Sequence, residues 1–432
     1  MKNQKKILQK FGINGLNPMQ QEAVAAIRSQ AEVVLLSPTG SGKTLAFLLP
    51  IVAKLSKETK AVQALIIVPS RELAIQIEQV ARQMGTGYKI NAFYGGQNFS
   101  KDRMELGHPP AILIGTPGRI ADHLRRHTFE TEHIKTLVLD EFDKSLEVGF
   151  EKEMKQITKA LHRVEKRILT SATQGVEIPD FVRVEDPVFI DYLGEGHPNL
   201  TIKTVISPDK DKLGTLVQLL SHLGNQPGIV FCNFKSSIRR VSEYLTSKNI
   251  SHGCFYGGME QMERERALIK FRNGSHQLLL ATDLAARGID VPEIKFIIHY
   301  HLPLKAEEFT HRNGRTARMH NEGTAYVLKW AREVLPDIVQ ADGAEDIQAA
   351  PLPSPSRWKT LFISGGRKDK ISKGDIAGLF FKQGNLNPGE LGIIELKQDC
   401  AFVSVPAAQS KKLVEQLNNS RIKKRKVRIM EV

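Results

Sequence analysis

Apolar and polar positions follow a regular plan along most of the chain. Short apolar runs are each followed by a turn and then by a stretch with the spacing of an amphipathic helix. The runs before residue 340 are AEVVLL, ALIIV, AILIG, LVLD, RILTS, GIVFC, SHGCFY, QLLLA, FIIHY and GTAYVLKW. Continuous apolar strands that alternate with helices are typical of parallel sheets covered on both faces. The pattern therefore predicts an α/β protein with two tandem parallel-sheet domains.

Two segments interrupt this plan. Residues 185–200 break the helical pattern and are expected to connect the two α/β domains, and residues 349–358 are rich in Pro and Ser. The chain after the second break predicts the element order βαββαβ, a small α+β domain like an RNA-recognition module (RRM). We place the domains at 1–192, 193–345 and 358–432, with a linker at 346–357.

Composition adds a basic charge balance. The 432 residues carry a formal net charge of +14, which favours a polyanionic partner. From Trp358 onward, 15 Lys and Arg face 7 Asp and Glu, and RIKKRKVRI at 421–429 is the densest stretch. It fits either a solvated edge strand or a phosphate-binding surface. No apolar run predicts a membrane span, and three distant cysteines favour a reducing cytoplasm over a disulfide or metal framework.

A glycine-rich loop, SPTGSGKT, lies between an apolar strand and an apolar helix. Gly40 and Gly42 allow backbone N–H groups to turn toward phosphates at a helix N-terminus. Lys43 can reach the β- and γ-phosphates, and Thr44 can hold Mg²⁺. The ATP-binding residues expected in this loop are Ser37, Thr39, Gly40, Ser41, Gly42, Lys43 and Thr44.

The run LVLDEFD ends in acidic residues, where a buried strand usually meets a turn. Phosphoryl transfer needs a held Mg²⁺ ion and an oriented water molecule. Asp140 is the expected metal-side carboxylate, and Glu141 is the candidate base for the water. Asp143 lies too far along the chain to bind the metal and is expected to link this motif to neighbouring motifs.

The loop and the DEFD acids occur with six other motifs in the order found in the DEAD-box RNA helicases. These motifs are PSREL, GG, TPGR, SAT, ATDLAARGID and HRNGRTAR, at residues 69–73, 95–96, 116–119, 171–173, 281–290 and 311–318. The resemblance implies two RecA-like domains and an RNA-stimulated ATPase that uses ATP with Mg²⁺ to unwind short duplexes. Phe142 stands where the family has Ala, and we interpret it as a packing change.

The resemblance also implies roles for individual residues. Gln20 matches the family's adenine-reading glutamine, and Asp290 matches its ribose contact. Arg315 and Arg318 match arginine fingers that join Lys43, Thr44, Asp140 and Glu141 in catalysis. The positions that couple hydrolysis to strand separation are Asp143, Ser171, Thr173 and His311.

The same resemblance implies an RNA track that grips sugar and phosphate without reading sequence. Its expected members in the first domain are Pro69, Arg71, Gly95, Gly96, Thr116, Gly118 and Arg119. Those in the second domain are Asn233, Gln261, Arg264, Gly274, Thr282 and Asp283.

The tail, with TLFISGGRKDKISKGDIAGLF, resembles the C-terminal domain of the bacterial DbpA-type helicases. This implies 23S ribosomal RNA, in precursors of the large ribosomal subunit, as the partner of a cytoplasmic monomer. Phe362 and Phe402 lie where aromatic side chains can stack on bases, and Arg367, Lys368 and Lys370 are further candidates. An ATP-gated RNA clamp and a general RNA chaperone in cold adaptation or RNA decay stay open as alternatives.

Overall fold

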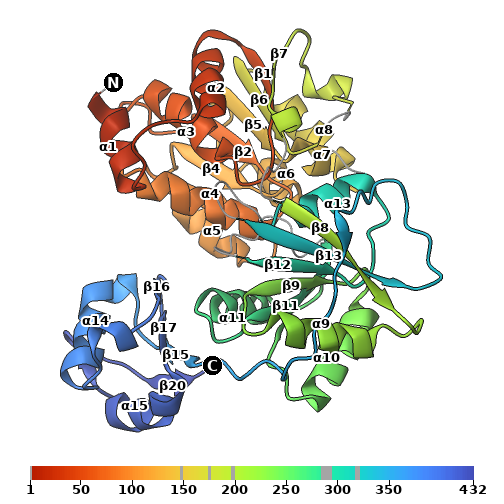
Figure 1. Cartoon of the computed structure of the whole chain (residues 1–432). Helices are drawn as coiled ribbons and strands as arrows, with labels where there is room; N and C mark the ends of the chain where they lie inside the picture. The colour runs from red at the N-terminus through yellow and green to blue at the C-terminus, as the bar shows by residue number, and fades with distance from the viewer. Residues whose placement is uncertain (1, 146–148, 174–176, 196–199, 284–293, 317–321) are drawn as a thin grey trace. The chain divides into compact units, whose positions relative to one another are not determined.

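The structure is a computed structural model that describes residues 2–145, 149–173, 177–195, 200–283, 294–316 and 322–432. The chain forms two compact units. The first unit contains one β-sheet, and the second contains the other two main sheets (Figure 1). None of the helices in the described ranges is long and apolar enough to cross a membrane.

The first unit is built on a parallel sheet with the strand order β3-β4-β2-β5-β6-β1-β7. Its strands are β1 (Glu32–Leu36), β2 (Ala64–Ile67), β3 (Ile90–Phe93), β4 (Ile112–Gly115), β5 (Thr136–Asp140), β6 (Lys166–Ser171) and β7 (Val188–Asp191). Its helices are α1 (Lys2–Lys10), α2 (Pro18–Ser29), α3 (Lys43–Lys54), α4 (Arg71–Gln83), α5 (Phe99–Leu106), α6 (Pro117–Arg125), α7 (Phe142–Ser145) and α8 (Glu151–Ala160).

Alternate residues of these strands face two separate cores. Leu35 and Ile66 pack with α1 to α4 on one face, whereas Val34 and Leu65 pack with α5, α6 and α8 on the other. Both faces are therefore buried, which explains why the central strands have continuous apolar runs. The carboxyl ends of the strands meet at one edge of the sheet, where ligands bind in open α/β folds.

The second unit begins with another parallel sheet, of order β10-β11-β9-β12-β13-β8-β14. Its strands are β8 (Leu200–Ser207), β9 (Gly228–Phe231), β10 (Gly253–Phe255), β11 (Leu278–Ala281), β12 (Phe296–His299), β13 (Gly323–Trp330) and β14 (Gly343–Ala344). Its described helices are α9 (Leu213–Leu223), α10 (Lys235–Ser247), α11 (Gln261–Arg272) and α13 (Ala306–Asn313).

The tail, residues 358–432, forms an antiparallel sheet of order β16-β17-β15-β20. Its elements are β15 (Trp358–Ile363), α14 (Lys373–Lys382), β16 (Ile394–Leu396), β17 (Ala401–Pro406), α15 (Ser410–Leu417), β18 (Arg421–Ile422), β19 (Arg425–Lys426) and β20 (Ile429–Glu431). Apolar residues of α14 and α15 pack on one face of the sheet (Figure 1). The βαββαβ order is present, with a small β18–β19 hairpin added before the last strand.

The predicted fold class, two parallel α/β domains and a small α+β domain, is confirmed. One local expectation differs, because residues 188–191 of the expected connection form β7 and pair with β1. Ile190 is buried in the first core, while Val188 and Phe189 stay exposed. The apolar run of this edge strand is only three residues long and buries a single side chain, which is too short a pattern to predict a strand.

Candidate nucleotide site and RNA interface

The phosphate loop joins β1 to α3 at the ligand-binding edge of the first sheet. Gly42 has a φ of 90°, in the left-handed region that favours glycine. A Cβ atom at Gly42 would lie 2.3 Å from Nε2 of Gln20, which donates a hydrogen bond to the Gly42 carbonyl at 3.2 Å. A glycine is therefore needed here for both the backbone conformation and the close approach of Gln20.

The start of α2 is tied to the same loop. Asn17 and Gln20 form a reciprocal capping box, and Pro18 occupies the first helical turn. Nδ2 of Asn17 also donates to the Ser41 carbonyl at 3.1 Å. These bonds keep Gln20, which is 5% exposed, beside the loop where an adenine-reading side chain is expected.

Lys43 turns its amine back into the loop. Nζ donates to the Ser37 carbonyl at 2.5 Å and to the Pro38 carbonyl at 3.0 Å. Thr44 follows in the first turn of α3, where helix N–H groups lack helical acceptors. The loop thus collects a cation, a hydroxyl and a helix N-terminus, the groups that bind phosphate.

Asp140 lies at the end of β5 and is almost completely buried. Its carboxylate accepts a hydrogen bond from the Thr170 hydroxyl of β6. Burial and the neighbouring Glu141 carboxylate raise the pKa of Asp140 to about 6, although Thr170 and Lys43 act in the opposite direction. The site therefore contains negative charge that its own hydrogen bonds do not fully compensate.

Glu141 has a φ of 49°, in the left-handed region that residues other than glycine rarely adopt. The residue is 7% exposed, and its Oε2 atom has no hydrogen-bond partner among the described residues. A buried carboxylate oxygen without a donor is costly, so a functional partner is the simplest explanation. Two adjacent buried carboxylates, one of them close enough to the Lys43 charge for its pKa to be affected, are hard oxygen ligands, which fit a divalent ion with its waters.

Asp143 joins the DEFD segment to the end of β6. Its carboxylate accepts from the Thr173 hydroxyl at 3.3 Å, and Thr173 N–H donates to the Ser171 hydroxyl at 3.0 Å. Phe142 is 2% exposed and packs in the core formed with α5, α6 and α8. The acids are therefore attached to β6, and the Phe142 ring points into the core and away from the chemistry.

The first-domain residues expected to contact RNA fall into two groups. Arg71 lies beside Gly95 and Gly96, and a Cβ atom at Gly96 would lie 2.7 Å from its guanidinium. Arg119, in contrast, forms an ion pair with Asp102 at 2.7 Å and donates to the Gln97 carbonyl at 3.1 Å. Arg119 is thus held within the domain. Of the rest, Pro69 precedes the N-cap of α4, Thr116 is the N-cap of α6, and Gly118 borders open space.

In the second domain, Arg312 is the centre of a buried network. It binds Asp283 with two hydrogen bonds of 2.5 Å and donates to the Asn233 amide oxygen at 2.8 Å and to the His301 carbonyl at 2.6 Å. Only 1% of its side chain is exposed. Asn233 and Asp283, two expected RNA contacts, are therefore held by an arginine to which the sequence reasoning assigned no role.

Other expected residues of this domain lie near the ends of its strands and helices. Gln261 begins α11, and the guanidinium of Arg264 lies 4.7 Å from the centre of the Phe255 ring. Thr282 follows β11, and Gly274 follows α11 with a φ of 74°. His311 and Arg315 are buried, at 6% and 4% exposure, and Arg315 Nε donates to the His311 carbonyl at 3.3 Å. Asp290 and Arg318 lie outside the described residues.

The tail brings its two basic segments together. Arg425 of the β18–β19 hairpin pairs with Asp369 at 2.9 Å, and Lys423 pairs with Asp375 at 2.9 Å. We define the basic cluster as the exposed residues of this surface: Arg367, Lys368, Lys370, Lys423, Lys424, Arg425 and Lys426. Phe362 is half-buried beside Phe402, with the rings edge to face at 5.6 Å.

Comparisons with known proteins agree with this geometry. Residues 17–181 match the DEAD/DEAH box helicase family, 211–320 the helicase conserved C-terminal domain and 360–431 the DbpA RNA binding domain. The ATP-dependent RNA helicase DbpA of Escherichia coli (strain K12) is 32% identical over 98% of this chain and 95% of its own. That of Bacillus subtilis (strain 168) is 28% identical over 98% and 96%.

A solved structure of the DEAD-box helicase Mss116 bound to ssRNA and UDP-BeF matches with a TM-score of 0.68 at 26% identity, over 80% of this chain and 78% of its own. The structure of S. cerevisiae Dbp5 bound to RNA and ADP BeF3 has the same fold, with a TM-score of 0.69 at 24% identity over 77% of this chain and 88% of its own. The helicase motifs, the two RecA-like sheets and the tail agree with these matches, and members of the matched family hydrolyse ATP. This chain therefore belongs to the DEAD-box ATP-dependent RNA helicases of the DbpA type.

Proposed function

We propose that this helicase locally unwinds 23S ribosomal RNA during assembly of the large ribosomal subunit, as a cytoplasmic monomer. The core positions inferred to bind RNA address sugar and phosphate, which carry no sequence information. A preference for one RNA must therefore come from the tail. The tail's resemblance to the DbpA type and its exposed basic cluster support this assignment.

The observation that carries the proposed chemistry is the pair of buried acids beside the phosphate loop. Lys43 and the loop amides bind the β- and γ-phosphates of ATP, and Ser37, Thr39 and Ser41 shape the loop. Thr44 and Asp140 would hold the divalent ion, which we take to be Mg²⁺ and which would neutralise phosphate charge. The raised pKa of Asp140 supports this, because a cation would restore its ionised form.

Glu141 is the proposed base. Its buried Oε2 atom keeps a free lone pair that can accept a proton from the attacking water. Glu141 follows the last residue of β5 and has a left-handed backbone conformation. Such strained conformations persist where the surrounding structure needs them, and they cluster at active sites.

The remaining roles extend the same proposal. Arg315 and Arg318 act as arginine fingers, which typically contribute about 10³–10⁵ in rate. Gln20 recognises adenine, Asp290 binds the ribose, and Asp143, Ser171, Thr173 and His311 couple hydrolysis to RNA. The proposed RNA-binding residues are Pro69, Arg71, Gly95, Gly96, Thr116, Gly118, Arg119, Asn233, Gln261, Arg264, Gly274, Thr282, Asp283, Phe362, Arg367, Lys368 and Lys370.

The target is tested by RNA-stimulated ATP hydrolysis in the full chain, with 23S ribosomal RNA compared with polyuridine. We expect stronger stimulation by 23S RNA, and Lys424→Glu with Lys426→Glu should abolish this preference while polyuridine stimulation stays. The matched control reverses two exposed lysines of α15, Lys411→Glu with Lys412→Glu, and should keep the preference.

Other outcomes would identify the alternatives. Equal stimulation by both RNAs in the unaltered chain would favour a general RNA chaperone. Long-lived RNA binding with little turnover and no release of short duplexes would favour an ATP-gated clamp. Deleting residues 358–432 should leave stimulation by generic RNA and remove the preference.

A further inference from the structure

The sheet of the first RecA-like domain has a second edge, formed by the amino ends of its strands. An open cavity of about 530 Å³ lies at this edge, among the amino ends of the neighbouring strands β2, β5, β6 and β1 and the last turns of α2 and α3. Its volume falls in the range of small-molecule sites, roughly 300–1,000 Å³. The nucleotide site lies at the opposite, carboxyl edge of the same sheet, so the two sites are separate.

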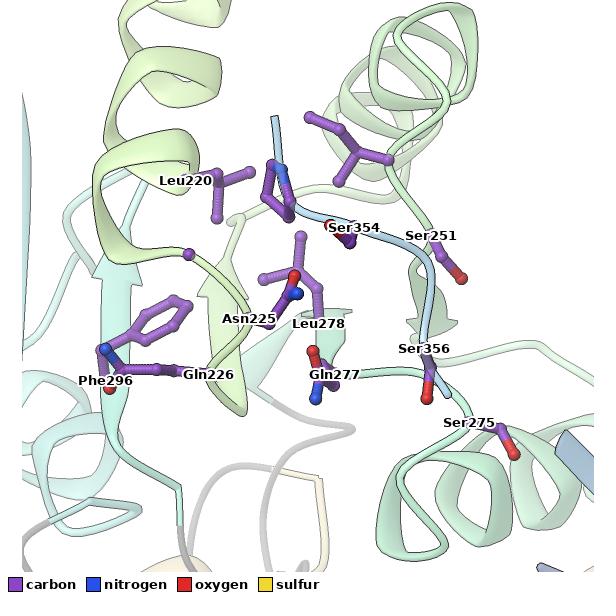
Figure 2. Close-up of a pocket in the computed structure, with 13 residues that line it drawn as sticks. Leu220, Asn225, Gln226, Ser251, Ser275, Gln277, Leu278, Phe296, Ser354 and Ser356 are labelled. Carbon is purple, nitrogen blue, oxygen red and sulfur yellow. The ribbon is translucent and has the colours of Figure 1, made fainter. Parts of the chain in front are cut away.

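A cavity of the second unit provides a comparison. It lies where Ser354 and Ser356 of the linker pass Gln277 and Leu278 (Figure 2). Its volume is about 30 Å³, which holds roughly one or two water molecules, and all of the described residues that line it are uncharged. The cavity of the first domain is larger and carries charge, so it is the better fit to a ligand.

The charge of the first-domain cavity is mainly positive. The Lys and Arg residues among its described lining are Arg28, Lys54, Lys135 and Lys166, and the acid among them is Glu165. Glu165 pairs with Lys135 at 2.5 Å, and 69% of the Glu165 side chain is exposed. This pair is neutral as a whole, so the other three cations give the cavity its charge.

The two helix C-termini at the cavity act against an anion. Each carries roughly half a negative charge, and Lys54 lies in the last turn of α3. The Lys166 amine donates to the carbonyl of Gln30, the C-cap residue of α2, so part of its charge serves this helix end. Together the two termini offset about one of the three positive charges, which leaves an excess of about two.

Lys166, the first residue of β6, supplies the most unusual of these charges because it is only 7% exposed. Burial, followed by the charge of Lys54, lowers the pKa of Lys166 to about 8, and within the described ranges no carboxylate acts in the opposite direction. A phosphate anion between the two amines would replace their repulsion with attraction and would favour the charged form of Lys166.

Hydrogen bonds hold one wall of the cavity in place. Gln63 accepts from the Ser56 N–H at 2.8 Å and donates to the carbonyls of Ser56 and Thr59, at 2.8 Å and 3.2 Å. These bonds attach the loop between α3 and β2 to a residue that is 9% exposed. The cavity is therefore preformed, and a compact ligand can bind without a large loss of conformational entropy in this loop.

We propose that this cavity is a binding site for a compact polyphosphate, free or part of a small phosphorylated metabolite, whose oxygens accept hydrogen bonds from Arg28, Lys54 and Lys166. An RNA backbone offers the same chemical groups, but the concave shape and the buried amine favour a small ligand. The inference is independent of the RNA target and of the hydrolysis mechanism. Because α3 begins at Lys43 in the phosphate loop and ends at Lys54, one helix reaches both sites.

Amine footprinting tests the proposal in the full chain. Lysines are acetylated with N-hydroxysuccinimide acetate, and peptide mass spectrometry measures the rate at each one. Saturating inorganic tripolyphosphate should slow acetylation of Lys54 and Lys166 about tenfold or more, because few sites stay empty. Lys152 and Lys159 are exposed lysines of α8 outside the cavity, and their rates should change less than about twofold, because salt screens exposed charges. Equal protection of both pairs would overturn the proposal.

Neutral substitutions then test the residues that bind the phosphates. Arg28→Gln with Lys54→Gln changes two exposed side chains and should preserve the fold. The tripolyphosphate concentration that half-protects Lys166 should rise about tenfold or more, because charge-assisted hydrogen bonds are lost. The matched control, Lys152→Gln with Lys159→Gln, should leave this concentration unchanged. An unchanged value in the Arg28→Gln and Lys54→Gln variant would contradict the proposal.

Two further arms separate this cavity from the other phosphate sites. Lys43→Ala removes the cation of the phosphate loop and should leave the protection of Lys166 intact. Loss of that protection would assign the ligand to the loop and overturn the proposal. Saturating polyuridine should change the acetylation rate of Lys166 by less than about twofold, because a preformed cavity excludes a continuous backbone. Protection by polyuridine as strong as that by tripolyphosphate would assign the cavity to RNA and also overturn the proposal.

Discussion

The sites at the edges of the two RecA-like sheets differ in how well their buried charges are paired. In the first, Asp140 and Glu141 are adjacent buried acids, the pKa of Asp140 is raised to about 6, and a Glu141 oxygen has no described partner. In the second, the Arg312 guanidinium is surrounded by Asp283, Asn233 and a backbone carbonyl. The acids of both sites lie at the carboxyl ends of parallel strands, Asp140 at the end of β5 and Asp283 just after β11.

The difference shows which site is prepared for a ligand. Uncompensated charge costs stability in the absence of a ligand, and a cation with phosphate would remove that cost. A fully paired arginine instead stabilises the positions of its neighbours. We therefore interpret the first site as the catalytic site. The second is a structural network that holds Asn233 and Asp283 in position. Substitutions and pH changes that alter only one of the two sites can test this contrast.

The largest effect is expected from Arg312→Met. This change leaves Asp283, Asn233 and the His301 carbonyl without their donor in a buried place, and breaking such a pair costs about 3–5 kcal/mol. Urea unfolding monitored in the second domain should show this loss. Arg332→Met is the control, because Arg332 is an exposed arginine beside Trp330 and its loss should cost less than about 0.5 kcal/mol. Similar losses for both variants would contradict the contrast.

Asp140→Asn should have opposite effects on activity and stability. Losing the metal-side carboxylate should reduce ATP turnover about 10²–10³-fold, the scale for removal of one electrostatic group in an active site. The folded protein should become more stable by about 1–3 kcal/mol at pH 7, because a buried carboxylate with a raised pKa is replaced by a neutral amide. The change in unfolding temperature relative to the unaltered protein should then be positive for Asp140→Asn and negative for Asp283→Asn. Destabilisation by both would argue that Asp140 is as well compensated as Asp283.

The two domains should also respond oppositely to acid. Burial, followed by the Arg312 charge, lowers the pKa of His299 to about 3, and burial lowers that of His301 to about 4. The unfolded chain takes up protons first as pH falls below about 6.5, so the second domain loses about 1.4 kcal/mol per pH unit for each histidine. Asp140 acts the other way, because its folded pKa of about 6 exceeds its ordinary value of 3.8.

Between pH 6 and pH 4 the folded form of Asp140 gains a proton that the unfolded form lacks, which stabilises the first domain. Native-state hydrogen exchange at both pH values separates these effects by domain. Protection of β12 should fall at pH 4 relative to protection of β5. The outcome against this account is a parallel loss of protection in both strands.

Gly42→Ala should produce the smallest change. The new methyl group meets Nε2 of Gln20 at 2.3 Å and forces a left-handed conformation that costs alanine about 1–2 kcal/mol. We expect ATP affinity, measured by titration with a fluorescent ATP analogue, to weaken about tenfold. Gly378→Ala, in α14 with open space around it, is the control and should bind ATP normally.

Much of the fold could be predicted because the central strands are buried on both faces. The continuous runs that become β2, β4 and β5 are examples. The edge strands β7 and β8 escaped prediction. The apolar run of β7 is only three residues long, and polar residues interrupt that of β8, because most residues of both strands are exposed or half-buried. The phosphate loop and the DEFD acids could be recognised because their residues are consecutive in sequence.

The Arg312 network could not be predicted in the same way. Its members come from segments around residues 233, 283 and 312, and only folding brings them together. The same holds for Arg119, an expected RNA contact that the structure pairs with Asp102. The domain boundaries and the roles of individual residues remain predictions.

The most direct test of the central claim, that the first site holds uncompensated acids for phosphoryl transfer, is the ATP hydrolysis rate of Glu141→Gln with saturating RNA. The amide keeps the size of the side chain but cannot act as a base, so turnover should fall about 10²–10⁴-fold while ATP still binds. Hydrolysis at the full rate would contradict the claim.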